Sequence, residues 1–94
     1  MTLGLLSIET YLPSAHSLKD KRSILRKVID RIRHRHNVCI AEVGNNDLWQ
    51  RASLAVCMVA NDSAFVDSVL SKILREIENN LDGEIVDYTI DLSR

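Results

Sequence analysis

The sequence has 94 residues, enough for one domain and too few for two, and its 46% hydrophobic residues exclude a disordered chain. Its formal net charge of −1 gives no indication of a polyanionic partner. No apolar stretch approaches the ~20 residues that a bilayer requires, and Met1-Thr2-Leu3-Gly4 lacks the features of a signal peptide, so we expect one cytosolic domain over residues 1–94 with no membrane contact.

The first part of the chain predicts a strand, a helix and a second strand. Residues 3–12 alternate in polarity as a strand does, and Pro13 ends the pattern because proline has no N–H for a ladder. Ser17 and Asp20 form the pattern of a capping box, so a helix is expected from there to about residue 35. A second strand is expected over residues 37–43.

A hairpin follows the second strand. Gly44-Asn45-Asn46-Asp47 is a turn-forming run, and a third strand is expected over about residues 50–60. Folding the two strands against each other places Cys39 opposite Cys57. In a reducing cytosol we expect these cysteines to be buried thiols rather than a disulfide.

The last third of the chain completes an alternating order of elements. Asn61-Asp62-Ser63 offers a cap for a second helix that ends near Asn79 and Asn80, and residues 84–92 alternate as a last strand. Each βαβ half needs a right-handed crossover, so both helices fall on one face of the sheet. The sequence therefore predicts an α+β fold, a ferredoxin-like βαββαβ two-layer sandwich with a four-stranded antiparallel sheet and two helices on one face.

Positive charge is concentrated in the first helix. Residues 17–36 contain eight basic and two acidic residues, a net charge of +6, whereas the remainder contains four basic and eleven acidic residues, a net charge of −7. The helix dipole explains cations in the last turn but not in the first turns. The face is either a solvated surface that keeps the protein soluble or a surface that binds RNA phosphates. The nucleic-acid-binding residues predicted here are Lys19, Arg22, Arg26, Lys27 and Arg33.

Lys21 departs from this pattern, because its helical angle lies near the apolar stripe. We expect its stem to cover the edge of the core while its ammonium group reaches water. An ion pair with a carboxylate from a strand is the alternative.

The segment after the turn contains the only tryptophan of the chain, in Asp47-Leu48-Trp49-Gln50-Arg51. One interpretation is that the indole of Trp49 closes one end of the core. The other is a recognition loop, in which Trp49 anchors a partner and Arg51 holds a phosphate or carboxylate. We include Arg51 among the nucleic-acid-binding residues and Trp49 as a partner-binding residue.

The sheet face away from the helices is expected to carry Ser7, Glu9 and Tyr11 on the first strand. Only Tyr11 could stack a base there, so we do not expect RNA to be bound on this face. Small apolar residues on the same face have no cover in a monomer: Ala41, Ala55, Cys57 and Val59. We therefore expect a homodimer through this face or a docked protein partner.

Catalysis is the weakest hypothesis. No nucleophile is paired with a general base by spacing, and no glycine-rich phosphate loop is present. The run from His34 through His36 to Cys39 matches no standard zinc pattern, so surface imidazoles and a buried thiol are expected. We predict no catalytic residue, no metal site and no cofactor.

Several short runs are similar to the YlxP-like family, a bacterial domain of unknown function. They are Ser17-Leu18-Lys19-Asp20-Lys21-Arg22, Asn37-Val38, Ala41-Glu42-Val43 and Asp47-Leu48-Trp49-Gln50-Arg51-Ala52. The resemblance covers nearly the whole chain and implies a ferredoxin-like fold, a bacterial cytosolic protein and a link to translation or ribosome maturation. It implies no catalytic residues.

The function predicted from the sequence is a non-catalytic RNA- or ribosome-associated protein that contacts phosphates through the basic helix. The alternative is a protein–protein interaction or dimerisation module without nucleic-acid binding. A small-molecule sensor or enzyme ranks last.

Overall fold

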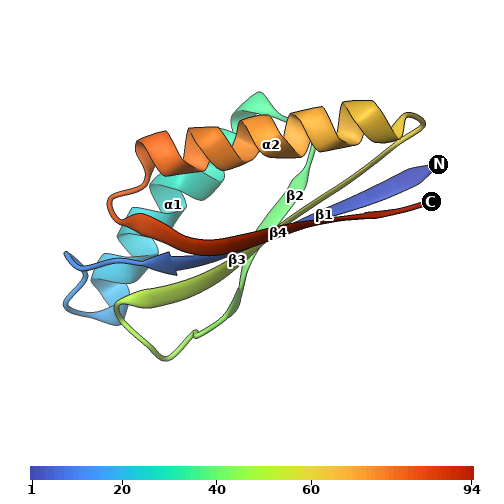
Figure 1. Cartoon of the computed structure of the whole chain (residues 1–94). Coiled ribbons are helices and arrows are strands. Elements are labelled where there is room, and N and C mark those ends of the chain that lie inside the picture. The colour runs from blue at the N-terminus through green and yellow to red at the C-terminus, as the bar shows by residue number, and fades with distance from the viewer.

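Four strands and two helices alternate along the chain in the predicted order. The computed structural model describes residues 1–94, and its elements are β1 (Thr2–Tyr11), α1 (Leu18–Arg35), β2 (Cys39–Gly44), β3 (Arg51–Ala60), α2 (Ser63–Asn80) and β4 (Glu84–Ser93). Both helices lie on the same face of the sheet (Figure 1). The predicted ferredoxin-like βαββαβ fold is confirmed.

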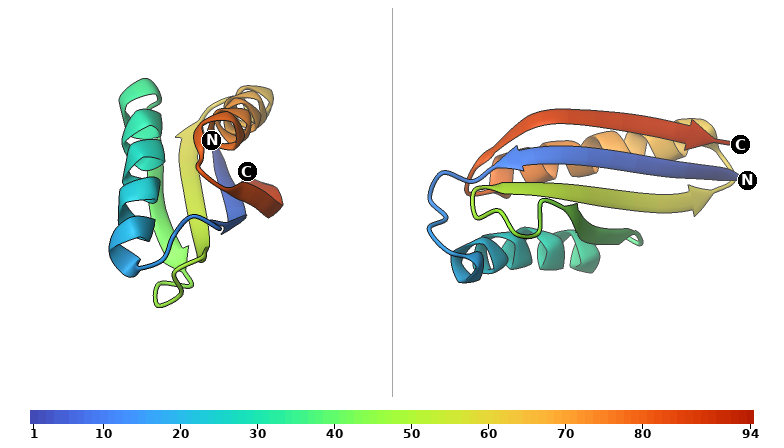
Figure 2. Two further views of the ribbon diagram at one scale, coloured as in Figure 1. Left: turned by 90° about the vertical axis from the view of Figure 1, so that its left-hand side faces the viewer. Right: turned by 90° about the horizontal axis from the view of Figure 1, so that it is seen from below.

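The sheet has the strand order β2-β3-β1-β4, and every neighbouring pair is antiparallel. The two long central strands therefore separate two edge strands, and β2 is the edge strand that lies next to α1 (Figure 2). Cys39 pairs with Cys57 and Ile40 with Val56, which confirms the predicted hairpin register. A left-handed residue at the turn, Asn45 with φ 61°, allows the chain to reverse there.

The pattern of β4 differs from simple alternation. A bulge in its pairing with β1 lies between Glu9 and Thr10 and brings Thr10 opposite Ile85. Ile85 therefore packs against the core, whereas Val86 is 48% exposed. The expected strict alternation over residues 84–92 would place Val86 on the same side as Ile90, and that was wrong because the extra residue in β4 shifts the period of 2 by one position.

The core fills the space between the sheet and the helices. Sixteen buried apolar residues form one cluster, to which β1, β3 and both helices contribute. Helix α2 approaches β1 closely at Gly4, where an added Cβ would lie 2.4 Å from Val66 Cγ1 and 2.8 Å from Leu70 Cδ1. Glycine at this position lets the helix pack directly on the strand.

Both helices begin at the predicted caps. The backbone N–H of Asp20 donates to Ser17 Oγ at 3.0 Å, and the Asp20 carboxylate accepts from the N–H of His16 at 3.0 Å. Asp62 caps α2 by accepting from the N–H of Ala64. These bonds satisfy donors that the first turn of a helix leaves free, and they fix where each helix starts.

The molecule is elongated, with extents of 42 × 21 × 17 Å, and both termini lie at the same end (Figure 1). Neither helix combines the length and the apolar character needed to cross a lipid bilayer.

Candidate nucleic-acid interface

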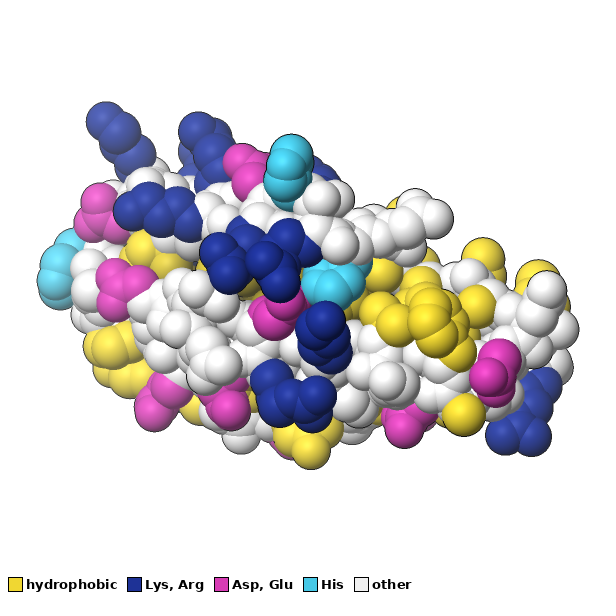
Figure 3. Space-filling model, turned by 90° about the horizontal axis from the view of Figure 1, so that it is seen from above, with side chains coloured by type: hydrophobic (Ala, Val, Ile, Leu, Met, Phe, Trp, Pro, Cys, Tyr) yellow, Lys and Arg dark blue, Asp and Glu magenta, His cyan; other side chains and the backbone are white.

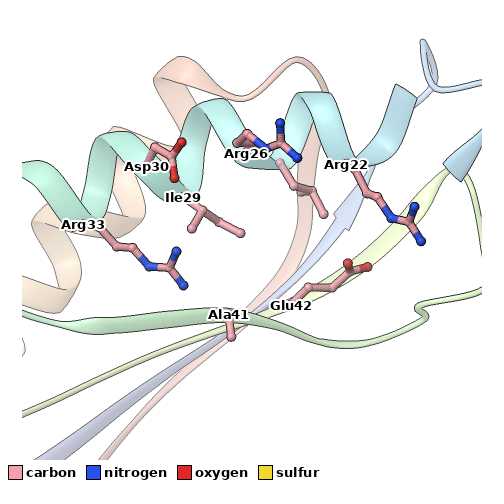
Figure 4. A pocket seen from close by; sticks show the side chains of 8 residues that line it. Arg22, Arg26, Ile29, Asp30, Arg33, Ala41 and Glu42 are labelled. Atoms are coloured by element: carbon pink, nitrogen blue, oxygen red, sulfur yellow. The ribbon is translucent and has the colours of Figure 1, made fainter. Parts of the chain in front are cut away.

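A groove of about 390 Å³ runs between α1 and the edge strand β2 (Figure 4). Three of the predicted arginines line it from one face of the helix: Arg22 and Arg26 are one turn apart, and Arg33 lies two turns further on. Leu25 and Ile29 supply its apolar wall on the helix side, and β2 borders it at Ala41 and Glu42. The hydrophobic stripe of α1 packs on the sheet, so the arginines that flank the stripe project over the edge strand.

Five cations of α1 make no ion pair and no side-chain hydrogen bond within the molecule. They are exposed to solvent, and they are Lys19, Arg22, Arg26, Lys27 and Arg31. Cationic side chains crowd the α1 side of the surface in Figure 3. These groups can meet an external anion without first breaking an internal contact, and the helix spaces them by about 1.5 Å per residue.

The remaining cations of the segment are engaged within the protein. Arg33 Nη2 donates to the carbonyl of Ile40 at 2.9 Å and so ties α1 to the free edge of β2. Arg35 pairs with Glu76 of α2 at 3.1 Å. The predicted site residue Arg33 therefore lies in the groove, but its guanidinium already holds the edge strand in place.

Glu76 receives a second partner, His36, whose Nε2 lies 2.5 Å from Glu76 Oε2. Burial of this carboxylate by itself would raise its pKa, but the hydrogen bond and charge of His36 and the charge of Arg35 outweigh burial and lower the pKa. His36 is therefore not the ordinary surface imidazole that the sequence suggested. It joins the end of α1 to α2.

Lys21 lies inside the protein. Its side chain is 1% exposed, and its Nζ lies 2.8 Å from Glu42 Oε2 on β2. The expectation that this ammonium reaches water was wrong, and the alternative of a strand carboxylate is confirmed. Glu42 Oε2 is buried and makes no well-aligned hydrogen bond, so the attraction to Lys21 is ionic and compensates for its burial.

The loop between β2 and β3 is held from two sides. Lys21 Nζ donates to the carbonyls of Asn45, Asn46 and Arg51 at 2.9, 3.2 and 3.4 Å. On the other side, Gln50 Nε2 donates to the carbonyls of Pro13 and Ala15, at 3.1 and 3.2 Å. These hydrogen bonds fix the backbone on both sides of the loop tip, which consists of residues 47–49.

Trp49 stands at this tip and is 54% exposed. The interpretation that its indole closes the core was wrong, because the two anchors direct the tip outward. Together with Tyr11, Leu48 and Arg51 it lines a recess of about 490 Å³. The Arg51 guanidinium lies over the Tyr11 ring at 5.2 Å from its centroid, so a cation–π pair borders the recess, whose lining also includes Asp47.

The sheet face away from the helices is apolar at one end and polar at the other. The polar end has Glu9, which accepts from Ser53 Oγ at 2.6 Å. The apolar end has Leu3 and Leu5, 43% and 39% exposed, which the sequence interpretation did not include in the uncovered patch. Cys39 and Cys57 lie there too, exposed and partly exposed, so the expectation of buried thiols was wrong because their strands turn both side chains away from the helices.

Two acidic residues also belong to the groove, and neither was predicted from the sequence as a site residue. Asp30 lies on α1 between Arg26 and Arg33, and Glu42 points up from β2 (Figure 4). Because Lys21 compensates Glu42, Asp30 is the carboxylate that reduces the positive potential of the groove. The sequence did carry an indirect signal for Glu42. Lys21 lies near the apolar stripe in a helical projection, and a lysine buried there requires a partner of opposite charge.

Comparisons with known proteins agree with this architecture. The model of the family described as "Protein of unknown function (DUF503)" matches residues 3–90. A Bacillus subtilis protein, "Uncharacterized protein YlxP", is 31% identical over 77 residues, which cover 82% of this chain and 84% of that protein.

Two solved structures are similar in fold. A de novo designed protein with a ferredoxin fold has a TM-score of 0.55 and 19% identity, covering 99% of this chain and 83% of its own. A C-terminal segment of the alpha subunit of aIF2 from Pyrococcus abyssi has a TM-score of 0.51 and 18% identity, covering 100% of this chain and 51% of its own. At these identities the likeness shows the fold alone.

Proposed function

The chain belongs to the DUF503 family, described as proteins of unknown function, and on that premise we propose that it is a non-catalytic, cytoplasmic RNA- or ribosome-associated protein. In this proposal the exposed cations of α1 contact successive phosphates of an RNA strand. The observation that carries the proposal is that five cations on one helix have no internal partner. A surface that only needed to be soluble would not require eleven of the thirteen acidic residues to lie outside residues 17–36 of the sequence.

The groove beside β2 sets the path that a bound RNA strand would follow along α1. Arg22 and Arg26 are one turn apart and both line it, so their guanidinium groups can meet neighbouring phosphates of a single strand. Asp30 lies beyond them and would repel a phosphate. The bound strand is therefore expected to follow the first turns of α1, through Lys19, and not its last turn.

The loop that carries Trp49 is the second contact of the proposal. Lys21 connects the first turns of α1 to this loop, so Lys19 and Arg22, the free cations of those turns, lie at the same end of the domain as the exposed indole. A base stacked on Trp49, beside the cationic Arg51 and Tyr11 pair, would add an attraction that does not depend on sequence.

Charge reversal tests this proposal. Arg22→Glu with Arg26→Glu is expected to weaken binding to oligouridine and to bacterial ribosomes by about tenfold per arginine, because each charge-assisted contact contributes roughly 1.5 kcal/mol. The matched control is Lys72→Glu with Arg75→Glu, the same change of charge on exposed residues of α2. Equal binding by both double variants would mean that α1 is not the binding surface.

The second candidate function is a protein–protein module that dimerises through the open sheet face. The specific observation in its favour is the exposed apolar end of that face, where Leu3, Leu5 and Val59 lie on adjacent strands in register. Light scattering tests it: a dimeric mass that becomes monomeric in Leu5→Glu supports this function, and a monomeric mass at high concentration excludes it.

A further inference from the structure

Two thiols face each other on the open side of the sheet. Cys39 on the edge strand β2 is the direct register partner of Cys57 on β3. Residues directly opposite each other in an antiparallel pair project to the same face, and neither cysteine is in a disulfide. The two sulfurs are therefore neighbours on one surface.

The backbone geometry suits a covalent bond between them. Directly opposite residues of an antiparallel pair have Cα atoms about 4.5–5.5 Å apart. A disulfide accepts Cα separations of about 4.4–6.8 Å. The two strands therefore need no rearrangement of their pairing for the sulfurs to join.

The pair is also accessible. Cys39 and Cys57 are both part of the lining of two adjacent shallow hollows of about 200 and 300 Å³, whose other walls include Leu5 and Val38. Cys39 is exposed and lies on the edge strand, while Cys57 is partly exposed between β2 and β1. A small molecule reaches Cys39 first, and Cys57 stands beside it.

We propose that Cys39 and Cys57 form a dithiol modification site that low-molecular-weight disulfides, such as oxidised glutathione, convert to a cross-strand disulfide. The Cys39 thiolate attacks one sulfur of the small disulfide, whose S–S bond breaks and releases one thiol. The Cys57 thiolate then attacks the Cys39 sulfur of the mixed disulfide and expels the second thiol. The two cysteines lose two protons and two electrons, and the small disulfide gains them.

The same exposure makes the modification reversible. Exposed disulfides are reduced more readily than buried structural ones, so a reducing thiol pool returns the pair to its free state. The bond would also fasten the edge strand that forms one wall of the arginine groove to β3. The site does not depend on RNA binding, because neither cysteine lies in that groove.

Mass spectrometry of the full chain with and without oxidised glutathione tests the proposal. The wild type is expected to lose about 2 Da and both alkylatable thiols, to carry no adduct and to stay a single chain on a non-reducing gel, and dithiothreitol is expected to reverse the change. Cys57→Ser is expected to accumulate a stable glutathione adduct on Cys39, because no second thiol can expel it.

A variant with the β2 thiol moved by two residues tests whether the disulfide requires the directly opposite pairing of Cys39 and Cys57. In Cys39→Ala with Ala41→Cys, the new thiol stays on the same exposed face of β2 but lies diagonally from Cys57, at a Cα separation of about 7–8 Å that a disulfide does not span. This variant is expected to keep the adduct. A wild type that keeps stable adducts, joins two chains or retains both free thiols under these conditions would overturn the proposal.

Discussion

The Nζ of Lys21 lies 2.8 Å from Oε2 of Glu42, in a position where the lysine is 1% exposed and the glutamate 22%. This pair joins the basic helix to the edge strand, and the same ammonium group holds three carbonyls at the ends of the Trp49 loop. The buried ammonium group of Lys21 therefore stabilises both the edge strand of the groove and the Trp49 loop.

Lys21→Met is expected to destabilise the fold by about 3 kcal/mol, because it leaves a partly buried carboxylate and the loop carbonyls without a partner. Because Glu42 is partly exposed, the loss of unfolding free energy should lie at the lower end of the range for breaking a buried ion pair. Urea unfolding measures it, with Lys19→Met as the exposed control on the same helix. Glu42→Gln should lower the unfolding free energy less in the Lys21→Met variant than in the wild type. If the effects of the two substitutions are instead additive, the two side chains are not coupled.

Gly4→Ala is expected to destabilise the protein by about 1–3 kcal/mol, because the new Cβ would fall within 2.4 Å of Val66 Cγ1. Shortening Val66 to alanine removes the closer of the two atoms in conflict and leaves Leu70 Cδ1 at 2.8 Å. Urea midpoints should therefore show a smaller effect of Gly4→Ala in the Val66→Ala background. An equal effect in both backgrounds would mean that α2 does not pack against β1 at this point.

The pH dependence of stability is expected to report on Glu76. Its pKa in the folded protein is lowered by His36 and Arg35, so the ionised carboxylate stabilises the fold above its usual pKa of 4.5 and this contribution is lost as the pH falls through the lowered value. Glu76→Gln should thus be less stable than wild type at neutral pH, with the gap closing in acid. The control is Glu78→Gln, the same substitution on α2 at an exposed residue without an ion pair, and an equal trend in both variants would contradict the role assigned to Glu76.

The fluorescence of Trp49 is expected to report on the proposed second contact directly, because it is the only tryptophan. Oligouridine should quench its emission, and Trp49→Ala should weaken binding by about 1–3 kcal/mol, the range for a stacked base. Because the indole lies outside the core, the variant should keep the unfolding midpoint of the wild type. Unchanged emission at saturating RNA would remove the loop from the interface.

Local signals in the sequence were sufficient for the elements and the hairpin. Ser17 and Asp20 mark the start of α1 by hydrogen bonds within one turn, and the turn at Asn45 fixes which cysteines face each other. The bulge opposite Thr10 could not be read in the same way, because it depends on how β4 meets a strand more than seventy residues earlier in the chain.

The basic face of α1 was visible in the sequence, but which of its charges are free was not. Arg33 lies on the same side of a helical projection as Arg22 and Arg26, and Arg35 lies on another side. Only the folded chain shows that Arg33 is held by the carbonyl of Ile40 and Arg35 by Glu76. The side-chain partners of a surface cation come from other elements. The exposure of Trp49 likewise follows from the anchors on Gln50 and Lys21, which join segments distant in sequence.

The salt dependence of RNA affinity tests the central claim most directly. For a single strand, the logarithm of the binding constant falls with the logarithm of salt concentration by about 0.7 for each phosphate neutralised. Replacing Arg22 and Arg26 by glutamine should therefore reduce the slope by about 1.4, while the same replacement of Lys72 and Arg75 should leave it unchanged. Equal slopes for wild type and the Arg22 and Arg26 variant would contradict the assignment of α1 as the phosphate-binding surface.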